Sequence, residues 1–408
     1  MRIAVPVEGS PRFLPEAFSQ EEFLLYRRMA DRDRAVLAVG VLREVDAPTF
    51  DAQGQADDWY FGVLRYEWRH ALFGEGGRIT DHTRWYVPRY VIEWVGARTV
   101  VHALPEDVHQ VEAWVAAMKG AAFTSGTYSI DLQWTERVPR DRYIQAVQKL
   151  LAHIQRGDIY EVNYCTTRKA RVPDFDPFAA FAALDQRSQA PFSAFLRDGD
   201  SFAVCASPER FLAFRGKHVT GEPMKGTRPR HAEGDADRAA AVELANDAKE
   251  RSENIMALDV MRHDLSRIAA SGSVRVSELC AVRSYPRVHQ LVSTVEADLR
   301  EGLDPLDVLR ATFPMASMTG APKLRAMQLI DEAEQGPRGL FSGSLGFFAP
   351  DGTGDFNVVI RTLLFNAKTT ELSLTTGSAI TALCDPEQEF EECEVKARSV
   401  IDALRHDR

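Results

Sequence analysis

Strand-like runs that follow one another without a helix between them restrict the fold of this chain more than any other feature. They are rich in aromatic and β-branched residues and are separated by turn residues, which is typical of sheet. The clearest runs are 35–39, 59–64, 90–95, 340–349, 356–366 and 370–376. Apolar residues recur at helical spacing over 105–119, 141–156, 235–270, 304–312, 322–334 and 386–405. Because strands and helices do not alternate strictly, we expect an α+β fold, with helices laid on sheets.

The texture of the sequence changes after residues 128–132, where β-like runs give way to longer helical patterns. The 408 residues, of which 45% are apolar and 26% charged, are enough for one large domain or two ordinary ones. We therefore predict an N-terminal β-rich subdomain of residues 1–125 and a larger domain of residues 126–408 that carries the chemistry.

Charge and cysteine content exclude several classes of protein. The formal net charge is −10, and no run of like charge suggests a nucleic-acid partner. The five cysteines form no Cys-x-x-Cys pair, which predicts a reducing, cytoplasmic location. The first residues contain no apolar core of a signal peptide, and no stretch reaches the roughly 18 apolar residues of a membrane helix. We expect no membrane partner.

Lys225 stands between two residues that shape the backbone, in the segment Pro223-Met224-Lys225-Gly226. Proline fixes its own φ, and glycine allows backbone angles that other residues avoid. A lysine held in such a turn can act as a nucleophile. The alternative is a basic surface loop, because Pro and Gly mark turns first of all.

Two helical stretches carry acidic residues on one face. Glu250 and Glu253 are one turn apart, and Glu389, Glu392 and Lys396 also share a face. Carboxylate oxygens are the ligands of hard cations such as Mg²⁺. The alternatives are a solvated acidic face and an ordinary i,i+4 surface pair. Periodicity does not choose between Glu250 and Glu253.

Other candidates are weaker taken singly. His289 stands among apolar residues and could be a hydrogen-bonded core histidine or an acid or base. Gly377 follows a strand-like run and could present backbone N–H groups to a carboxylate, or could belong to a simple turn. The chain has no nucleophile elbow, phosphate loop, dinucleotide fingerprint or glutaminase-type cysteine. If it uses ammonia, we expect another chain to release it, with no fused glutaminase segment here.

Eight motifs in fixed order make a far more specific signal than any one of them. Together they resemble the chorismate-utilising enzymes, over residues 139–404. The motifs are Gly157–Asn163 (GDIYEVN), Ser207–Phe211 (SPERF), Pro223–Arg230 (PMKGTRPR), Lys249–Asn254 (KERSEN), Val288–Thr294 (VHQLVST), Thr319–Lys323 (TGAPK), Ile360–Thr362 (IRT) and Glu389–Glu392 (EFEE). The resemblance implies an anthranilate synthase component I-like fold, with two facing β-sheets, helices on the outside and the active site in the central cleft.

The residue at Lys225 separates the branches of this family. Anthranilate synthase-like members usually have alanine there, whereas the aminodeoxychorismate synthase component I branch usually has lysine. The resemblance thus implies conversion of chorismate and ammonia, supplied by a glutamine amidotransferase subunit, to 4-amino-4-deoxychorismate, the precursor of p-aminobenzoate and folate. The isochorismate and salicylate branches have a lysine where this chain has Glu161. The alternatives are anthranilate synthase component I and, more distantly, a non-catalytic chorismate-binding protein.

The resemblance also assigns roles to single residues. It implies Lys225 as the nucleophile, Glu209 as the general acid and His289 as a further catalytic residue. It implies Glu253 and Glu392 as ligands of Mg²⁺, which is the expected cofactor. The implied substrate-binding residues are Thr227, Arg361, Gly377, Lys396, Ser317 and Thr319.

These roles set conditions on two side chains. An amine attacks only as the neutral base, so we expect a depressed pKa for Lys225, caused by desolvation or by Arg228. Glu209 must be protonated to act as an acid, which favours an apolar setting. The chain departs from the usual family pattern at Glu161, where glutamine is common in the amino-transferring branches, and at His263, Met315, Ala316 and Phe341.

Overall fold

The computed structural model describes residues 2–7, 15–29, 34–74, 82–118, 128–130, 132–136, 138–334 and 336–405. Within these residues, 20 strands form one hydrogen-bonded network in which every ladder is antiparallel. The strands are β1 (Ile3–Val7), β2 (Phe23–Arg28), β3 (Arg34–Val45), β4 (Tyr60–Leu64), β5 (Thr83–Val95), β6 (Arg98–Ala103), β7 (Thr135–Glu136), β8 (Glu161–Arg171), β9 (Ala194–Asp198), β10 (Ser201–Cys205), β11 (Arg210–Arg215), β12 (His218–Gly221), β13 (Met224–Pro229), β14 (Arg275–Ser284), β15 (Val288–Asp298), β16 (Gly320–Ala321), β17 (Ser344–Phe348), β18 (Thr353–Asn357), β19 (Thr362–Asn366) and β20 (Glu371–Thr381).

Helices cover the outer faces of this network. The α-helices are α1 (Trp68–Leu72), α3 (Val108–Met118), α4 (Arg140–Gln155), α5 (Pro177–Ser188), α6 (Gly234–Asn246), α7 (Ala248–Ser266), α8 (Pro305–Thr312), α9 (Lys323–Ala333) and α10 (Pro386–Ile401). Four short 3₁₀ segments add to them: η1 (Pro15–Phe18), η2 (Pro105–Asp107), η3 (Ala316–Met318) and η4 (Asp402–Leu404). The expected α+β class is therefore confirmed.

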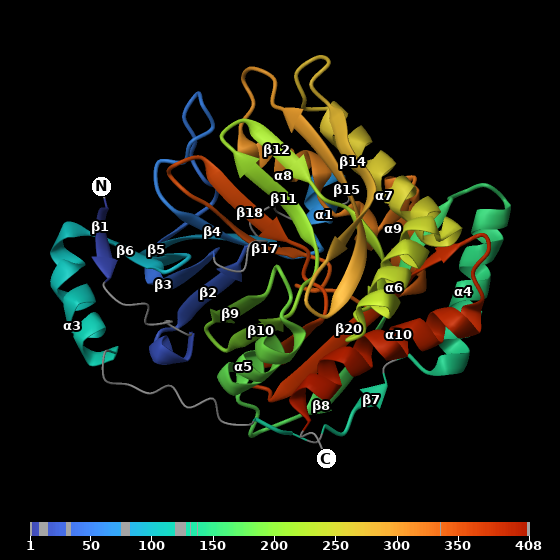
Figure 1. The fold of residues 1–408 in the computed structure, drawn as a ribbon, viewed down its shortest axis with the longest axis horizontal. Helices are drawn as coiled ribbons and strands as arrows, with labels where there is room; N and C mark the ends of the chain where they lie inside the picture. Colours follow the sequence, from blue (N-terminus) through green and yellow to red (C-terminus); the bar gives the residue numbers. More distant parts are fainter. Residues whose placement is uncertain are drawn as a thin grey trace.

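The strands form two layers that face each other, as expected. One layer runs β8, β20, β19, β10, β9, β2, β3, and lies in the lower half of Figure 1. The other runs β4, β17, β18, β11, β12, β15, with β13 and β14 both paired to β15. The long strand β5 pairs with β3 and with β4, so it joins the layers into one network.

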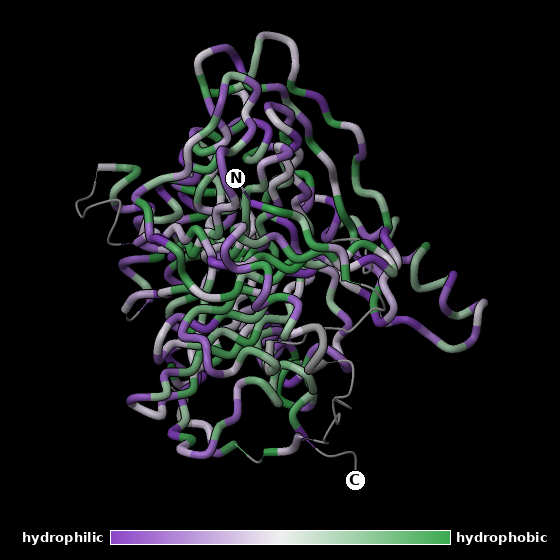
Figure 2. The backbone as a smooth tube through the Cα atoms, turned by 90° about the vertical axis from the view of Figure 1, so that its left-hand side faces the viewer, coloured by the Kyte–Doolittle hydropathy of each residue, from purple (hydrophilic) through white to green (hydrophobic). Residues whose placement is uncertain are grey.

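An apolar cluster lies between the layers. Leu25 and Leu196 from the first layer share this cluster with Phe61 and Phe347 from the second, and all four are at most 3% exposed. The rings of Phe61 and Phe347 stack with centroids 5.7 Å apart. Figure 2 shows that hydrophobic stretches of the chain lie inside the molecule and that hydrophilic stretches lie on the outer loops. Burial of these side chains is the main force that holds the layers together.

Strands from the first third of the chain pair with strands from the remainder. β2 pairs with β9, and β4 pairs with β17. Residues 119–127, which contain the expected boundary, lie outside the described residues. The division into 1–125 and 126–408 stays a prediction.

Local signals explain where the helices next to the site begin. Asp247 accepts a hydrogen bond from the Glu250 N–H and caps α7, so the helical pattern of 235–270 is broken into α6 and α7. Asp385 caps α10 in the same way, and Pro386 occupies its first turn. Figure 1 shows α4, α6, α7 and α10 along one side of the molecule. Among the described residues, no helix has the length and apolar character needed to cross a membrane.

Candidate active site

Lys225 on β13 forms an ion pair with Glu161 on β8, with 2.7 Å between Nζ and Oε1. Both side chains are buried, at 10% and 4% exposure. Burial alone would lower the pKa of Lys225, but the carboxylates of Glu161, Glu253 and Glu209 outweigh it, and the pKa is raised. The expected depressed pKa of Lys225 is therefore wrong.

Arg228 does not depress the pKa of Lys225 either, because it lies among carboxylates of its own. Its guanidinium pairs with Asp247 at 2.8 Å, Glu243 at 3.2 Å and Glu250 at 3.5 Å. The ion pairs of Arg228 also distinguish Glu250 from Glu253, which helical periodicity alone could not do. Glu250 meets Arg228, whereas Glu253 acts on Lys225.

Gly226 shapes the turn that presents Lys225. Its φ is +79°, and a Cβ there would lie 3.0 Å from Glu250 Oε2 and 3.1 Å from Leu244 Cδ1. The ladder between β13 and β15 shifts register between Lys225 and Thr227, so the glycine forms a bulge. The shaped turn predicted around Lys225 is thus present, and Thr227 after it is exposed.

Glu209 lies directly before β11 and is 5% exposed. Its Oε1 accepts a hydrogen bond of 2.7 Å from Ser317 Oγ, and its backbone N–H donates to Ser207 Oγ at 3.2 Å. Burial raises the pKa of Glu209 to about 7. The Ser317 hydrogen bond and the ammonium groups of Lys225 and Lys396 act in the opposite direction. A carboxyl group with this pKa can hold a proton near neutral pH, as a general acid must.

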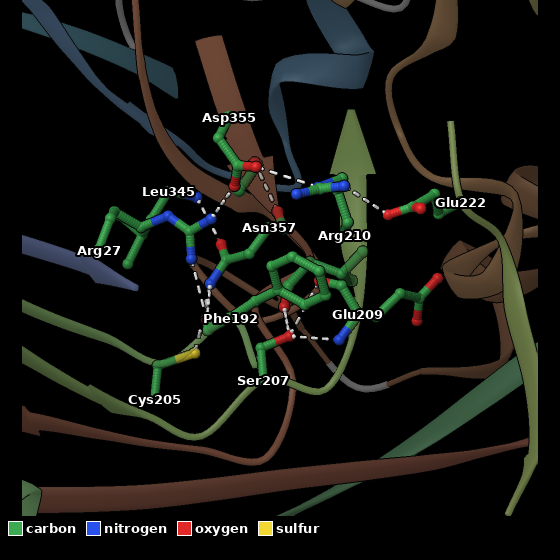
Figure 3. Close-up of polar contacts among 12 residues, drawn as sticks. Arg27, Phe192, Cys205, Ser207, Glu209, Arg210, Glu222, Leu345, Asp355 and Asn357 are labelled. Carbon is green, nitrogen blue, oxygen red and sulfur yellow. Dashed lines mark hydrogen bonds and ion pairs between the residues drawn. The ribbon is translucent and has the colours of Figure 1, made fainter. Parts of the chain in front are cut away.

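A buried charge network fixes the strand that follows Glu209 (Figure 3). Arg210 donates to Asp355 at 3.0 Å and to Glu222 at 2.7 Å. Asp355 also accepts from Arg27, which is fully buried, at 2.6 Å. These bonds hold the beginning of β11, and so they position Glu209.

Ser317 and Thr319 lie in the loop that contains η3 and ends at β16. The Ser317 carbonyl accepts from Asn163 Nδ2 at 3.2 Å, which ties the loop to β8. The Thr319 hydroxyl donates to the carbonyls of Met315 and Ala316, at 3.0 and 3.3 Å, so it closes the loop on itself. Ser317 therefore reaches the acid Glu209, whereas the Thr319 side chain supports the loop.

Lys249 connects the acidic residues of α7 and α10. Its Nζ lies 3.9 Å from Glu253 Oε1 and 3.3 Å from Glu389 Oε1. Among the described residues, Glu253 Oε1 is buried and has no hydrogen-bond partner. Burial raises the pKa of Glu253 to about 7, and it also raises the pKa of Glu389.

Lys396 on α10 links Glu392 to β20. Its Nζ lies 2.5 Å from Glu392 Oε1 and donates to the Gly377 carbonyl at 2.8 Å. Burial opposes ionisation of Glu392, but Lys396 outweighs it and lowers the pKa of that carboxyl. A Cβ on Gly377 would lie 2.5 Å from Cys165 Sγ, so the glycine lets β20 approach β8 closely. The backbone group of Gly377 that contacts Lys396 is thus its carbonyl, which accepts a hydrogen bond from this lysine.

Arg361 lies between β18 and β19 with a φ of +53°, a conformation that non-glycine residues seldom adopt outside functional sites. Its Nη1 donates to Ser399 Oγ at 3.0 Å. Burial lowers the pKa of Arg361, and Glu392 only partly opposes this. A partly desolvated guanidinium of this kind favours an anion beside it.

His289 on β15 is 2% exposed, and protein groups occupy both of its ring nitrogens. Nδ1 lies 2.8 Å from Ser284 Oγ, and Nε2 lies 3.0 Å from Asp237 Oδ1. This arrangement fits the alternative of a hydrogen-bonded core histidine. His289 therefore has no part in the mechanism proposed below.

The chemistry of the Glu253 carboxylate suits a ligand of magnesium. The described residues contain no group of three or more His, Cys, Asp or Glu arranged to hold a metal. Magnesium, however, usually takes one or two protein carboxylates and completes its shell with water and substrate oxygens. Glu253 and Glu392 supply two carboxylates from α7 and α10, and Glu253 Oε1 has no hydrogen-bond partner among the described groups.

Sequence reasoning did not assign three of these residues to the site. Glu161 was only a departure from a family pattern, whereas it is the partner of Lys225. Glu389 and Lys249 belong to the motifs of the resemblance without a role of their own, whereas they form the bridge between two helices. Their helical spacing was visible, but nothing in it shows that α7 and α10 meet.

Comparison with known proteins identifies the family of the chain. A family model described as chorismate binding enzyme matches residues 18–402. An aminodeoxychorismate synthase of Streptomyces griseus is 45% identical over 270 residues, which are 66% of this chain and 37% of the relative. Aminodeoxychorismate synthase component 1 of Escherichia coli is 38% identical over 298 residues, 73% of this chain and 65% of the relative. Anthranilate synthase component 1 of Thermus thermophilus is 40% identical over 265 residues, which are 65% of this chain and 57% of the relative. The chain thus spans under two thirds of each of these relatives.

Solved structures share the fold. The menaquinone-specific isochorismate synthase of Escherichia coli superposes with a TM-score of 0.81 at 18% identity, and the match covers 99% of this chain and 94% of that one. Anthranilate synthase component I of Streptococcus pneumoniae gives a TM-score of 0.75 at 21% identity, with 98% and 92% covered. The ordered motifs, the two-layer fold and the family model lead to one conclusion: the chain belongs to the family of chorismate binding enzymes.

Proposed function

We propose that this chain is an aminodeoxychorismate synthase component that converts chorismate and ammonia to 4-amino-4-deoxychorismate. The observation that carries the proposal is the buried position of Lys225, among carboxylates and close enough to Glu209 for the two charges to interact. A nucleophile and a protonated acid are what displacement of a ring hydroxyl requires. The names of the Streptomyces griseus and Escherichia coli relatives support the same reaction.

In the first half of the reaction, the Lys225 amine adds at C2 of the ring. The double bonds shift toward C4, and the C4–O bond breaks. Glu209, whose pKa of about 7 allows it to carry a proton, protonates the departing hydroxyl so that it leaves as water. Ser317 orients the Glu209 carboxyl through its hydrogen bond.

In the second half, ammonia adds at C4 and the double bonds shift back. The C2–N bond to Lys225 breaks, and the lysine leaves with the electron pair of that bond. The new ammonium group at C4 gives a proton to the Glu209 carboxylate, which restores the acid. Atoms balance as chorismate plus ammonia to product plus water.

We assign two cations to the two carboxylates of the substrate. The Arg361 guanidinium is partly exposed, and its positive charge favours an anion beside it. The Lys396 ammonium interacts electrostatically with Glu209. Glu253 and Glu392 would hold Mg²⁺, with Glu389 close to Glu253 through Lys249. Bound magnesium would offset negative charge on the substrate and orient it.

Ammonia would come from a glutamine amidotransferase subunit. The designation "component 1" of the Escherichia coli relative fits an enzyme with a second component. We place the reaction in the cytoplasm, because the five cysteines are free thiols.

Incubation of the protein with chorismate, Mg²⁺ and ammonium, followed by mass spectrometry, tests the proposal. We expect 4-amino-4-deoxychorismate, and no product from a Lys225→Ala variant. Fluorescent anthranilate formed without an added lyase would overturn the proposal.

Anthranilate synthase component I is the second candidate. The Thermus thermophilus relative, at 40% identity, favours it. The lysine at position 225 argues against it, because members that resemble anthranilate synthase usually have alanine there. A non-catalytic chorismate-binding protein would give no product in the same incubation.

A further inference from the structure

One step of the proposed reaction still needs a proton acceptor. Lys225 must be a neutral amine when it adds to the ring. Three carboxylates surround it, however, and keep its ammonium form. A proton must therefore leave Nζ before or during the attack, and a buried site needs an acceptor within hydrogen-bond distance.

Glu161 is the acceptor that the geometry provides. Within the described residues, the one hydrogen bond of Lys225 Nζ goes to Glu161 Oε1, at 2.7 Å. Glu209 is engaged by Ser317 and has its own proton to deliver. Glu253 influences Lys225 through space, without a hydrogen bond to it.

The backbone holds Glu161 rigidly. It pairs with Thr381 on β20 and with Ala321 on β16, so it belongs to a strand with neighbours on both sides. Gly320 packs directly on it, since a Cβ there would lie 2.1 Å from the Glu161 carbonyl oxygen. A base on a fixed strand keeps its distance to the nucleophile during the reaction.

We propose that Glu161 is a catalytic residue that takes the proton of Lys225 and later returns it, an inference that rests on the proposed function. The Glu161 carboxylate accepts a proton from Nζ, and the nitrogen lone pair then forms the C2–N bond. When ammonia expels the lysine, Nζ leaves as a neutral amine and regains the proton from the Glu161 carboxyl. The ion pair is restored, and Glu209 handles the proton of the leaving hydroxyl separately.

Exclusion of water favours this transfer. Moving the proton from Nζ to Oε1 replaces two buried charges by two neutral groups, and the cost of burying charge falls accordingly. Both side chains are already at most 10% exposed, and a bound substrate would cover them further. The Lys225 side chain is thus an ammonium ion in the ion pair and becomes a neutral amine when Glu161 takes its proton.

Single-turnover mixing with chorismate and Mg²⁺ but without ammonia tests this role. Intact-protein mass spectrometry would follow the covalent adduct on Lys225 in wild type, Glu161→Gln and Glu161→Asp. Glutamine keeps the size and an acceptor oxygen, so we expect chorismate affinity within threefold of wild type but adduct formation roughly 100-fold slower. Aspartate keeps the carboxylate and should lie between wild type and Glu161→Gln. A purely structural role would change affinity and rate together, or neither.

Glu250→Gln is the matched control, because it replaces a carboxylate that meets Arg228 rather than Lys225, and its adduct rate should equal that of wild type. Equal adduct rates in Glu161→Gln and wild type would overturn the inference. Product without any adduct in wild type would overturn it as well, while the product assignment stands. A different product, such as anthranilate, would instead overturn the proposed function.

Discussion

Lys249 on α7 reaches Glu389 on α10, with 3.3 Å between Nζ and Oε1. The same ammonium lies 3.9 Å from Glu253 Oε1. It therefore places a positive charge beside a carboxylate that we expect to bind magnesium. Replacing Lys249 by glutamine removes repulsion against a divalent cation, so Mg²⁺ should bind roughly tenfold more tightly. Calorimetric titration without chorismate measures this, and an unchanged or weaker affinity would contradict it.

Magnesium binding should depend on pH through Glu253. The raised pKa of this carboxyl, about 7, means that a proton occupies it below pH 7 and competes with the cation. The dissociation constant should rise about fivefold between pH 7 and pH 6, and stay nearly constant above pH 8. Titrations at pH 6, 7 and 8 test this. Glu253→Gln should bind weakly at every pH, whereas Glu250→Gln should behave as wild type.

The ionised carboxylate of Glu209 should destabilise the folded protein. Its pKa in the folded protein, about 7, lies above the ordinary value of 4.5, so the folded state binds the proton more tightly than the unfolded state. This contribution to stability is present below about pH 4.5 and is lost as the pH rises toward 7. Glu209→Gln should therefore be more stable than wild type at pH 8, by at most roughly 3 kcal/mol.

Urea denaturation at pH 5 and pH 8 checks the Glu209 prediction. The stabilising effect of Glu209→Gln should be large at pH 8 and small at pH 5, while the variant loses synthase activity. An effect of equal size at both pH values would rule out the proton as its cause.

Gly226 should not tolerate a side chain. With a φ of +79° and neighbours within 3.1 Å of an added Cβ, Gly226→Ala should lose roughly 1–3 kcal/mol of unfolding free energy. It should also displace Lys225 from Glu161. Gly234→Ala is the control, because no positive φ is found there and the nearest group to an added Cβ is the Arg238 guanidinium at 3.4 Å. Equal stability of the two variants in urea would contradict this.

Asp355 should be essential to the core beneath Glu209. Asp355→Ala leaves the fully buried Arg27 without its 2.6 Å partner, so we expect a loss of about 3–5 kcal/mol. Adding Arg27→Met to that variant removes the uncompensated charge and should restore part of the stability. Thermal and urea unfolding measure both. A double variant less stable than Asp355→Ala would argue against charge burial as the reason.

The parts of the fold that sequence predicts are those set by neighbouring residues. Aromatic and β-branched runs marked the strands, and Asp247 and Asp385 set helix starts that apolar spacing had placed within a few residues. Strand partners depend on distant contacts instead. No local signal indicates that β4 pairs with β17, since the two lie at opposite ends of the chain.

The sequence predicts which residues form the site better than it predicts their pKa values. Ordered motifs brought Lys225, Glu209 and Glu253 into one prediction. The state of Lys225 depends on Glu161, which reaches it from another strand, and no spacing rule covers that contact. The sequence therefore predicted which lysine matters, but the sign of its pKa shift needed the structure.

Strands from the first half of the chain pair with strands near its end, so the sheet can be completed only late in translation. β4 finds its neighbour only when β17 has been made, and β8 finds β20 only after most of the chain has left the ribosome. The nascent first half must therefore wait with open strand edges, which are templates for aggregation. Such distant pairings also slow folding. Cells that make this protein should need chaperones for it during translation more than for a helical protein of equal length.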